Sequence, residues 1–338
     1  MSKTVTINDV ARTAGVSITT VSRILNNKPD VSPETRKRVL EAIVQLDYTP
    51  HAQAKNLAAG KSRSIAVLYP AHSNGLSELE FEFFVGASTI AAKRGFLFNL
   101  FVNTLSEHTL LNLYRSNQID GVILMEIHLQ DERVHLLQEN DYPFVMIGHC
   151  ADNEGLSYID LDFETSMLVS VDHLYKLGHR HIGLLSMSKA LRDAGYGPVV
   201  RTGRGYAQAC ARFGLTPLYY EAPTTIEDAY AATHRMLDEH PEITAMVTLH
   251  PDSSVGIVRA VQSRGLSIPQ DFSLIGIVID RIAKLISPPL TAITFPAYLM
   301  GERAAQMLIR MLQESEYEPE QELLTPHLII RDSTGPAR

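Results

Sequence analysis

The sequence predicts a chain of two parts: an N-terminal three-helix helix-turn-helix headpiece and a larger, two-lobed α/β body with two parallel sheets. Its 338 residues are too many for one ordinary domain. Residues 1–49 carry helical periodicity broken by short turns, whereas apolar runs alternate with amphipathic segments after residue 63. Residues 50–62, rich in alanine, lie between these parts. We therefore expect a headpiece at 1–49, a hinge helix or linker at 50–62 and a body at 63–338.

Charge is distributed unevenly between the two parts. The whole chain has a formal net charge of -8. Residues 1–64 hold ten Lys and Arg against five Asp and Glu, whereas the remainder holds twenty against thirty-three. A basic head on an acidic body indicates that only the head contacts the phosphates of a nucleic acid.

The composition also predicts a cytoplasmic chain. Lys3 is followed by polar residues rather than an apolar run, so we expect no signal peptide. No stretch approaches the roughly 20 apolar residues that a membrane span needs, so no membrane partner is expected. The two cysteines, Cys150 and Cys210, are too few for a disulfide framework and are expected to be small buried hydrophobic residues.

The first helix of the head is expected to begin at Ile7. Thr6 and Asp9 have the spacing of a capping box, in which each satisfies a backbone group of the other. Gly15 then marks a tight turn. The apolar residues that repeat at helical spacing are Ile7, Val10, Ala11 and Ala14.

Two further helices are expected in the head. Ser17 is a cap for the second helix, and Ser32 with Pro33 begins the third. Residues 26–30 form the loop between them. The apolar side of the second helix consists of Val21, Ile24 and Leu25. The residues expected to bury the inner face of the third are Val39, Leu40, Ile43 and Leu46.

The second helix has the side chains that a DNA recognition helix needs. In a helix-turn-helix this helix enters the major groove with its N-terminal end first. Arg23 can pair with guanine, and Ile18 and Thr19 can contact a thymine methyl group. On pattern alone, a generic three-helix protein-binding domain is the alternative. The polar side chains suited to phosphate oxygens are Ser17, Thr20, Ser22 and Asn26.

A long run of the head also matches a known family. Residues 6–26 read TINDVARTAGVSITTVSRILN, and VSPETR at 31–36 and YTP at 48–50 continue the match. This run resembles the headpiece of the lactose-repressor/galactose-repressor (LacI/GalR) family of transcriptional regulators. The resemblance implies that Ile18, Thr19 and Arg23 read bases in double-stranded operator DNA.

Residues 50–62 form the candidate hinge. A helix as short as 51–59 is marginal in water and needs a partner. The resemblance implies that this segment becomes helical on DNA, with Leu57 entering the minor groove beside Ala54 and Lys55. Without the resemblance, the segment would be a flexible linker and Leu57 would merely cover the next domain.

The body is expected to contain nine strands. Helical periodicity between them, as at 82–93 and 165–177, indicates parallel sheets covered on both faces. Nine strands suggest two sheets and therefore two lobes. The candidate strands are Ile65–Tyr69, Phe96–Val102, Gly121–Met125, Phe144–Ile147, Ile182–Met187, Ala245–Leu249, Ser273–Val278, Thr291–Phe295 and His327–Arg331.

Three strings of the body resemble the sensor domain of the same family. They are DHLYKLGHRHIG at 172–183, RGLSIPQDFSLIG at 264–276 and PPLT at 288–291. The resemblance implies a periplasmic-binding-protein-like (type I) fold, in which the chain crosses between lobes near residues 160, 291 and 323. The N-subdomain would then comprise about 63–160 and 292–322. The C-subdomain would comprise about 161–291 and 323–338.

Ligands of such folds bind between the lobes, at the carboxyl ends of the strands. Aromatic, charged and hydrogen-bonding residues follow several candidate strands and suit a small polar effector, although each alone is equally typical of a loop. In the N-subdomain they are Tyr69, His72, Leu79, Glu80, Met125, Glu126 and His149. In the C-subdomain they are Arg201, Thr202, Tyr220, His250, Asp252 and Asp280.

The body departs from the family at positions that usually clamp a sugar. Val278 stands where a carboxylate is expected, His250 and Pro251 replace an Asn-Asp pair, and Arg201 is displaced by one residue. A donor-rich, carboxylate-poor cleft would favour an anionic ligand such as a phosphorylated sugar or an organic acid. A neutral sugar or glycoside is equally favoured if nearby carboxylates point into the cleft. A nucleoside, or loss of ligand sensing, is the remaining alternative.

Other chemistry finds little support in the sequence. His179 and His181 have no cysteine or carboxylate cluster beside them, so no metal site is expected. No Gly-x-Ser-x-Gly motif is present, and the Gly203–Gly205 pair is too short for a nucleotide-binding motif, so we expect no cofactor.

These observations predict a homodimeric transcriptional regulator, with repression expected, that reads a near-palindromic operator and responds to a small effector. Two alternatives belong to other classes of protein. One is a small-molecule binding protein whose headpiece no longer binds DNA, and the other is a two-lobed enzyme.

Overall fold

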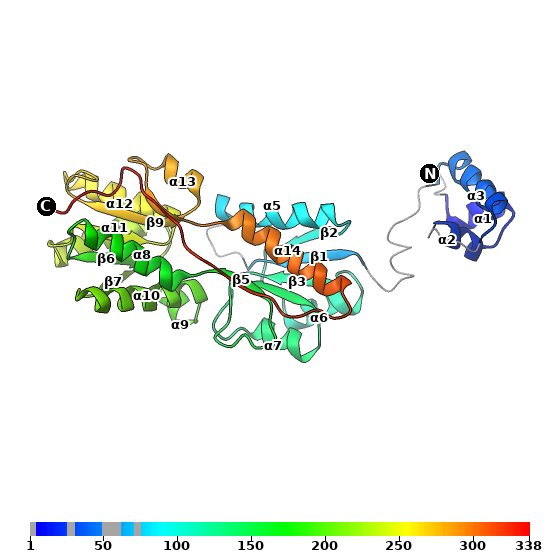
Figure 1. Cartoon of the computed structure of the whole chain (residues 1–338), viewed down its shortest axis with the longest axis horizontal. Coiled ribbons are helices and arrows are strands. Elements are labelled where there is room, and N and C mark those ends of the chain that lie inside the picture. The colour runs from blue at the N-terminus through cyan, green and yellow to red at the C-terminus, as the bar shows by residue number, and fades with distance from the viewer. Residues whose placement is uncertain (1–4, 26–30, 49–61, 71–75) are drawn as a thin grey trace. The chain divides into compact units, whose positions relative to one another are not determined.

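A computed structural model describes residues 5–25, 31–48, 62–70 and 76–338 (Figure 1). The chain divides into two compact units, Met1–Arg63 and Ser64–Arg338. We describe the first as the head and the second as the body.

The head contains three helices, α1 (Ile7–Ala14), α2 (Ile18–Leu25) and α3 (Pro33–Gln45). The predicted start of α1 is confirmed, because the Asp9 carboxylate accepts hydrogen bonds from the Thr6 backbone N–H at 3.0 Å and the Thr6 hydroxyl at 2.7 Å. Gly15 ends α1 with a φ of 62°, in the left-handed region that glycine adopts without strain. Ser32 caps α3 by accepting from the Thr35 N–H at 3.3 Å.

One small core holds the three helices of the head together. The buried members of this core are Val10, Ala11, Ala14, Val21, Ile24, Val39, Ala42 and Tyr48. The prediction for Leu40 is wrong, since half of its surface is exposed. The register of α3 turns Val39 and Ala42 inward, so Leu40 points to the opposite side of the helix.

The body contains two six-stranded sheets. The first has the order β11-β5-β4-β3-β1-β2, and all of its neighbouring strands are parallel. Its strands are β1 (Ser64–Leu68), β2 (Leu97–Phe101), β3 (Gly121–Leu124), β4 (Phe144–Ile147), β5 (Tyr158–Leu161) and β11 (Gln321–Leu324).

The second sheet has the order β12-β10-β9-β8-β6-β7 and is parallel except for the short β12, which runs antiparallel to β10. Its strands are β6 (Ile182–Ser186), β7 (Leu218–Glu221), β8 (Ala245–Thr248), β9 (Ser273–Val278), β10 (Thr291–Thr294) and β12 (Leu328–Ile329). The central strands are buried along their whole length, as expected of parallel strands that are covered on both faces.

Helices pack on both faces of each sheet (Figure 1). The first sheet carries α5 (Glu78–Lys93), α6 (Glu107–Arg115), α7 (Glu132–Glu139) and α14 (Ala297–Gln313). The second carries α8 (Phe163–Lys176), α10 (Gly197–Phe213), α11 (Ile226–Glu239) and α12 (Pro251–Ser263). Two short helices, α9 (Lys189–Asp193) and α13 (Asp280–Leu285), complete the body. The predicted two-lobed architecture with two mainly parallel sheets is confirmed.

The chain crosses between the two lobes after β5, after β10 and after β11. These crossings fall at about residues 162, 295 and 325, slightly later than the expected 160, 291 and 323. The reason is that Thr291–Thr294 pairs with β9 in the second sheet, whereas Gln321–Leu324 pairs with β5 in the first. Among the residues that the structure describes, no helix is long and apolar enough to cross a membrane.

Candidate DNA-binding surface and ligand cavity

The outward face of α2 carries the three side chains predicted to read bases. Val21 and Ile24 are buried against the other two helices of the head. Ile18, Thr19 and Arg23 lie on the opposite side and are exposed, with Ile18 leaving 49% of its surface open. An apolar side chain this exposed on a small folded unit is available to contact a thymine methyl group.

The hydroxyl groups at the start of α2 hold the helix end together. The Thr20 N–H donates to the Ser17 Oγ at 3.1 Å, and the two hydroxyl oxygens lie 2.8 Å apart. Ser17 therefore caps α2, as predicted. Ser22 is half-buried on the same helix. Asn26, Ala54, Lys55 and Leu57 lie outside the described residues.

A cavity of about 160 Å³ lies between the two lobes of the body. Its lining comes from the carboxyl ends of strands in both sheets, including Tyr69 after β1, Met125 after β3 and Leu249 after β8. This is the edge at which open parallel sheets bind ligands. Five aromatic side chains form part of the wall: Tyr69, Phe83, Phe163, Tyr196 and Phe295.

The charged groups of the cavity are mainly carboxylates. Glu80 at the start of α5, Glu126 after β3, Asp160 in β5 and Asp252 at the start of α12 all line it. His250 is the only imidazole among the described lining residues. Burial lowers the pKa of His250, although the charges of Asp252, Glu80 and Glu126 partly oppose this effect. Burial thus favours the neutral form of the imidazole.

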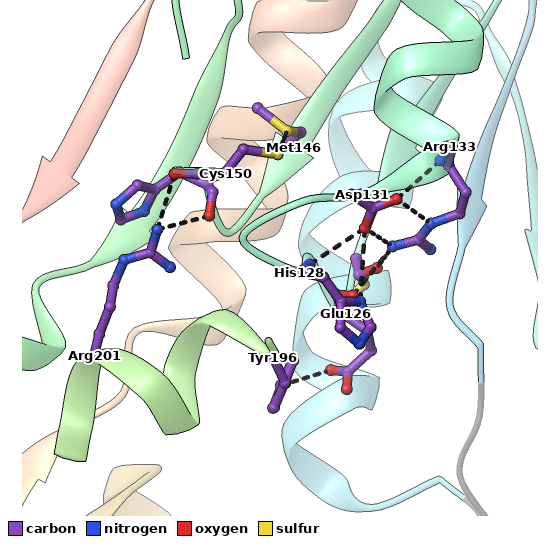
Figure 2. A network of polar contacts seen from close by, with 10 residues as sticks. Glu126, His128, Asp131, Arg133, Met146, Cys150, Tyr196 and Arg201 are labelled. Carbon is purple, nitrogen blue, oxygen red and sulfur yellow. Dashed lines mark hydrogen bonds and ion pairs between the residues drawn. The ribbon is translucent and has the colours of Figure 1, made fainter. Parts of the chain in front are cut away.

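Glu126 joins the two lobes through the C-lobe residue Tyr196, whose hydroxyl donates to the Glu126 carboxylate at 3.0 Å (Figure 2). Burial and the neighbouring Glu126 charge raise the pKa of Tyr196, so the phenol stays protonated and remains a donor. Backbone bonds reinforce the contact, because the Leu129 N–H donates to the Gly195 carbonyl at 2.8 Å.

An ion pair fixes the loop that carries Glu126. The Arg133 guanidinium binds the Asp131 carboxylate at 2.7 Å and donates to the carbonyls of Met125 and Glu126 at 3.0 and 3.1 Å (Figure 2). Burial of Asp131 opposes its ionisation, but hydrogen bonds from Arg133 and His128 outweigh burial and hold the pKa of Asp131 well below its usual range. Glu126 has a φ of 56°, which is unusual for a residue with a side chain and is sustained by these bonds.

Seven of the residues predicted to bind an effector line the cavity together. They are Tyr69, Leu79, Glu80, Met125, Glu126, His250 and Asp252. His72 lies outside the described residues. Sequence reasoning missed Asp160 and four aromatic residues of the wall, Phe83, Phe163, Tyr196 and Phe295. Asp160 lies in β5, which was not among the candidate strands.

Five other predicted residues do not line the cavity. The Arg201 guanidinium donates to the carbonyls of His149 and Cys150 at 2.8 and 3.0 Å (Figure 2). The His149 ring binds Asp160 at 2.8 Å and stacks on Tyr158.

The remaining three are held by their own lobe. Thr202 is fully buried in α10. Tyr220 is in the edge strand β7, where its hydroxyl donates to Glu239. Asp280 pairs with Lys284 and Arg331, and these contacts, led by Lys284, lower its pKa.

Comparison with known proteins accounts for both parts of the chain. Residues 6–51 match the model of the bacterial regulatory proteins of the lacI family, and residues 171–334 match a periplasmic binding protein-like domain. The chain is 32% identical to the HTH-type transcriptional regulator AglR of Rhizobium meliloti (strain 1021), over 98% of this chain and 95% of the relative. It is 31% identical to the HTH-type transcriptional repressor CytR of Escherichia coli (strain K12), over 97% and 96%.

Solved structures agree with this assignment. A lac repressor dimer bound to operator and the anti-inducer ONPF has a TM-score of 0.84 and 25% identity, over 98% of this chain and all of that one. A complex of the transcriptional regulator CelR with cellobiose has a TM-score of 0.73 and 26% identity, over 97% and 99%. The exposed recognition helix, the two-lobed body and these relatives together show that the chain belongs to the LacI family of DNA-binding transcriptional regulators and is not an enzyme.

Proposed function

We propose that this regulator binds a near-palindromic operator as a homodimer and that a small effector in the cavity between the lobes controls its affinity for the operator. The observation that carries the proposal is the cavity itself. Both lobes contribute its wall, so a ligand that fits it contacts both and favours one arrangement of them over others. The lac repressor structure, with a dimer on its operator and a bound anti-inducer, supports this assignment by similarity.

On DNA, Ile18, Thr19 and Arg23 would read bases, while Ser17, Thr20, Ser22 and Asn26 would contact phosphates. The hinge residues Ala54, Lys55 and Leu57 would enter or border the minor groove. Exposure of the first three side chains on one side of α2 supports the base-reading role.

Operator titration tests these assignments. Arg23→Ala should weaken binding to the correct operator by about 1–3 kcal/mol and relax the preference at one base pair. Lys55→Ala should instead weaken all DNA sequences similarly. Leu57→Ser should lower operator affinity and bending while leaving the fold intact. Unchanged sequence preference in Arg23→Ala would refute its role as a base reader.

The edge of the first sheet supports the homodimer. The edge strand β2 exposes Leu97 and Leu100, and the nearby helix α5 exposes Phe81 with 63% of its surface open. Apolar side chains grouped on an open sheet edge are a liability unless a partner covers them. A second copy of the chain, related by a two-fold axis, would cover this edge and place two heads on two half-sites.

A small-molecule binding protein without DNA binding is the competing function. The cavity alone would serve either function. The exposed base-reading face of α2 favours the regulator, because a head with no DNA partner has no need for an exposed isoleucine beside an arginine. Operator binding that is absent for the full chain but normal for the relatives would support the competing function.

A further inference from the structure

The start of α10 in the C-lobe pairs directly with the N-lobe, away from the three crossings of the chain. Two backbone hydrogen bonds join the lobes there. The Leu129 N–H donates to the Gly195 carbonyl at 2.8 Å, and the Gly197 N–H donates to the Ile127 carbonyl at 3.0 Å. The residues between these two pairs form an antiparallel bridge. The two lobes thus share a short piece of β-ladder in addition to their covalent connections.

One turn further along α10, the Arg201 side chain reinforces this pairing. Its guanidinium donates to the carbonyls of His149 and Cys150 in the N-lobe (Figure 2). Burial lowers the pKa of Arg201, and the negative charge of Asp160 opposes this effect. Asp160 is itself buried and held by the His149 ring and the Leu161 N–H. The N-lobe therefore presents fixed acceptors and a fixed negative charge to a cation of the C-lobe.

Gly197 allows the two lobes to approach each other this closely. A methyl group at Gly197 would collide with the Arg201 guanidinium and would lie 3.1 Å from the Ile127 carbonyl oxygen. The space that a larger residue would fill is therefore taken by the groups that join the lobes.

A second contact joins the lobes at α13. Ile279, which precedes α13 in the C-lobe, is buried in the hydrophobic core of the N-lobe. Ile282 packs against the cores of both lobes, and Arg281 pairs with Glu78 at the start of α5. The lobes are therefore joined by protein groups at two places besides the crossings.

We propose that these contacts form a latch, which holds the two lobes in the observed arrangement through protein groups alone, and that Arg201 is its central positioning residue. An effector in the cavity then acts on lobes that are already joined. It changes operator affinity by opening or reinforcing the latch rather than by bringing separate lobes together. The inference rests on the proposed effector function and names the element through which that function is regulated.

Hydrogen exchange on the full chain tests the latch without any ligand. The Leu129 and Gly197 amides donate across the lobes, so their exchange reports local separation of the lobes. The Val122 and Met246 amides, in buried strands of the two sheets, report unfolding of each lobe. Arg201→Met should raise the exchange rates of Leu129 and Gly197 about tenfold more than those of Val122 and Met246.

A second variant reaches the same prediction by another route. Gly197→Ala keeps every donor of the latch but adds a methyl group that conflicts with the latched position of Arg201. It should therefore raise exchange selectively at the same two interlobe amides. Arg204→Met, on the exposed side of α10, is the matched control and should exchange like the parent. A uniform rise at all four amides in both variants, or no rise, would overturn the inference.

Operator titration of the same proteins separates the latch from the proposed function. Both latch variants should change the ligand-free affinity for the operator by about fivefold or more, whereas Arg204→Met should leave it unchanged. Selective exchange at the interlobe amides with unchanged operator affinity would support the latch and reject control of operator affinity by the lobes. A uniform change in exchange with altered operator affinity would overturn the latch and leave effector control standing.

Discussion

At the scale of single residues, the Arg201 guanidinium connects the lobes on one side of the cavity. It projects from α10 in the C-lobe and donates to the carbonyls of His149 and Cys150 in the N-lobe. Only 6% of Arg201 is exposed, and burial lowers its pKa. Hydrogen bonds from a buried charged group are stronger than hydrogen bonds between neutral groups. A buried carbonyl that loses its donor also lowers the stability of the fold. Arg201 therefore stabilises the observed arrangement of the lobes.

Arg201→Met should lower the free energy of unfolding by about 1–3 kcal/mol, because methionine keeps most of the aliphatic volume but offers no donor. Denaturant unfolding of Arg201→Met and of a control variant measures this change in the free energy of unfolding. Arg204→Met, on the exposed side of the same helix, is the control and should cost less than about 1 kcal/mol, because Arg204 forms an exposed ion pair with Glu164. Equal effects of the two substitutions would show that the carbonyl contacts contribute nothing.

At the scale of elements, helices α5 and α14 of the first lobe pack closely against each other. A methyl group at Gly86 would lie 2.1 Å from the Tyr298 carbonyl oxygen, and one at Gly301 would lie 2.1 Å from the Phe83 carbonyl oxygen. Both contacts are with backbone, which cannot rotate away. The two glycines therefore let the helices approach each other, and the start of α5, which brings Glu80 to the cavity, depends on this packing.

Gly301→Ala should destabilise the body in spite of the higher helix propensity of alanine, which favours it by about 1 kcal/mol. The steric conflict with Phe83 forces the helices apart, and overpacking of this kind costs about 1–3 kcal/mol. Gly203→Ala in α10 is the matched control. Its added methyl group would lie 3.6 Å from the Tyr219 ring, an ordinary contact, so it should be neutral or stabilising. The melting temperatures of both variants test this prediction. A stabilised Gly301→Ala would contradict the predicted close approach of α5 and α14.

At the scale of the whole molecule, the proposed operator binding depends on joining two heads. A dimer that presents two heads gains the effective concentration of the second binding event, which a monomer lacks. The exposed β2 edge, with Leu97 and Leu100, is the surface we assign to this dimer.

Leu97→Asp should shift the protein toward monomer at micromolar concentration and lower operator affinity by at least about tenfold, with the head still folded. Sedimentation velocity and operator titration measure the two effects. Leu323→Asp is the control, because Leu323 is similarly exposed but lies in β11 on the opposite edge of the same sheet. A dimer that survives Leu97→Asp would place the interface elsewhere.

The sequence by itself determined the headpiece helices and most strands. Caps and turns act through neighbouring residues, so Thr6 with Asp9, Gly15 and Ser32 could be interpreted without knowledge of the fold. Strands buried on both faces, such as β4 and β9, are continuous apolar runs, so they too can be predicted from the local sequence. The strands β5, β7 and β11 were missed, because each contains polar residues and none is a continuous apolar run.

Only the tertiary structure decided which polar side chains share the cavity. Tyr69 and Glu80 could be predicted from their positions after a strand and at a helix start. Asp160 and Tyr196 come from segments that adjoin only when the two lobes meet. Arg201 was expected in the cavity, but its position on α10 points it at carbonyls of the other lobe. The direction of a side chain follows from the packing of its helix against elements that are distant in the chain, and the local sequence does not determine that packing.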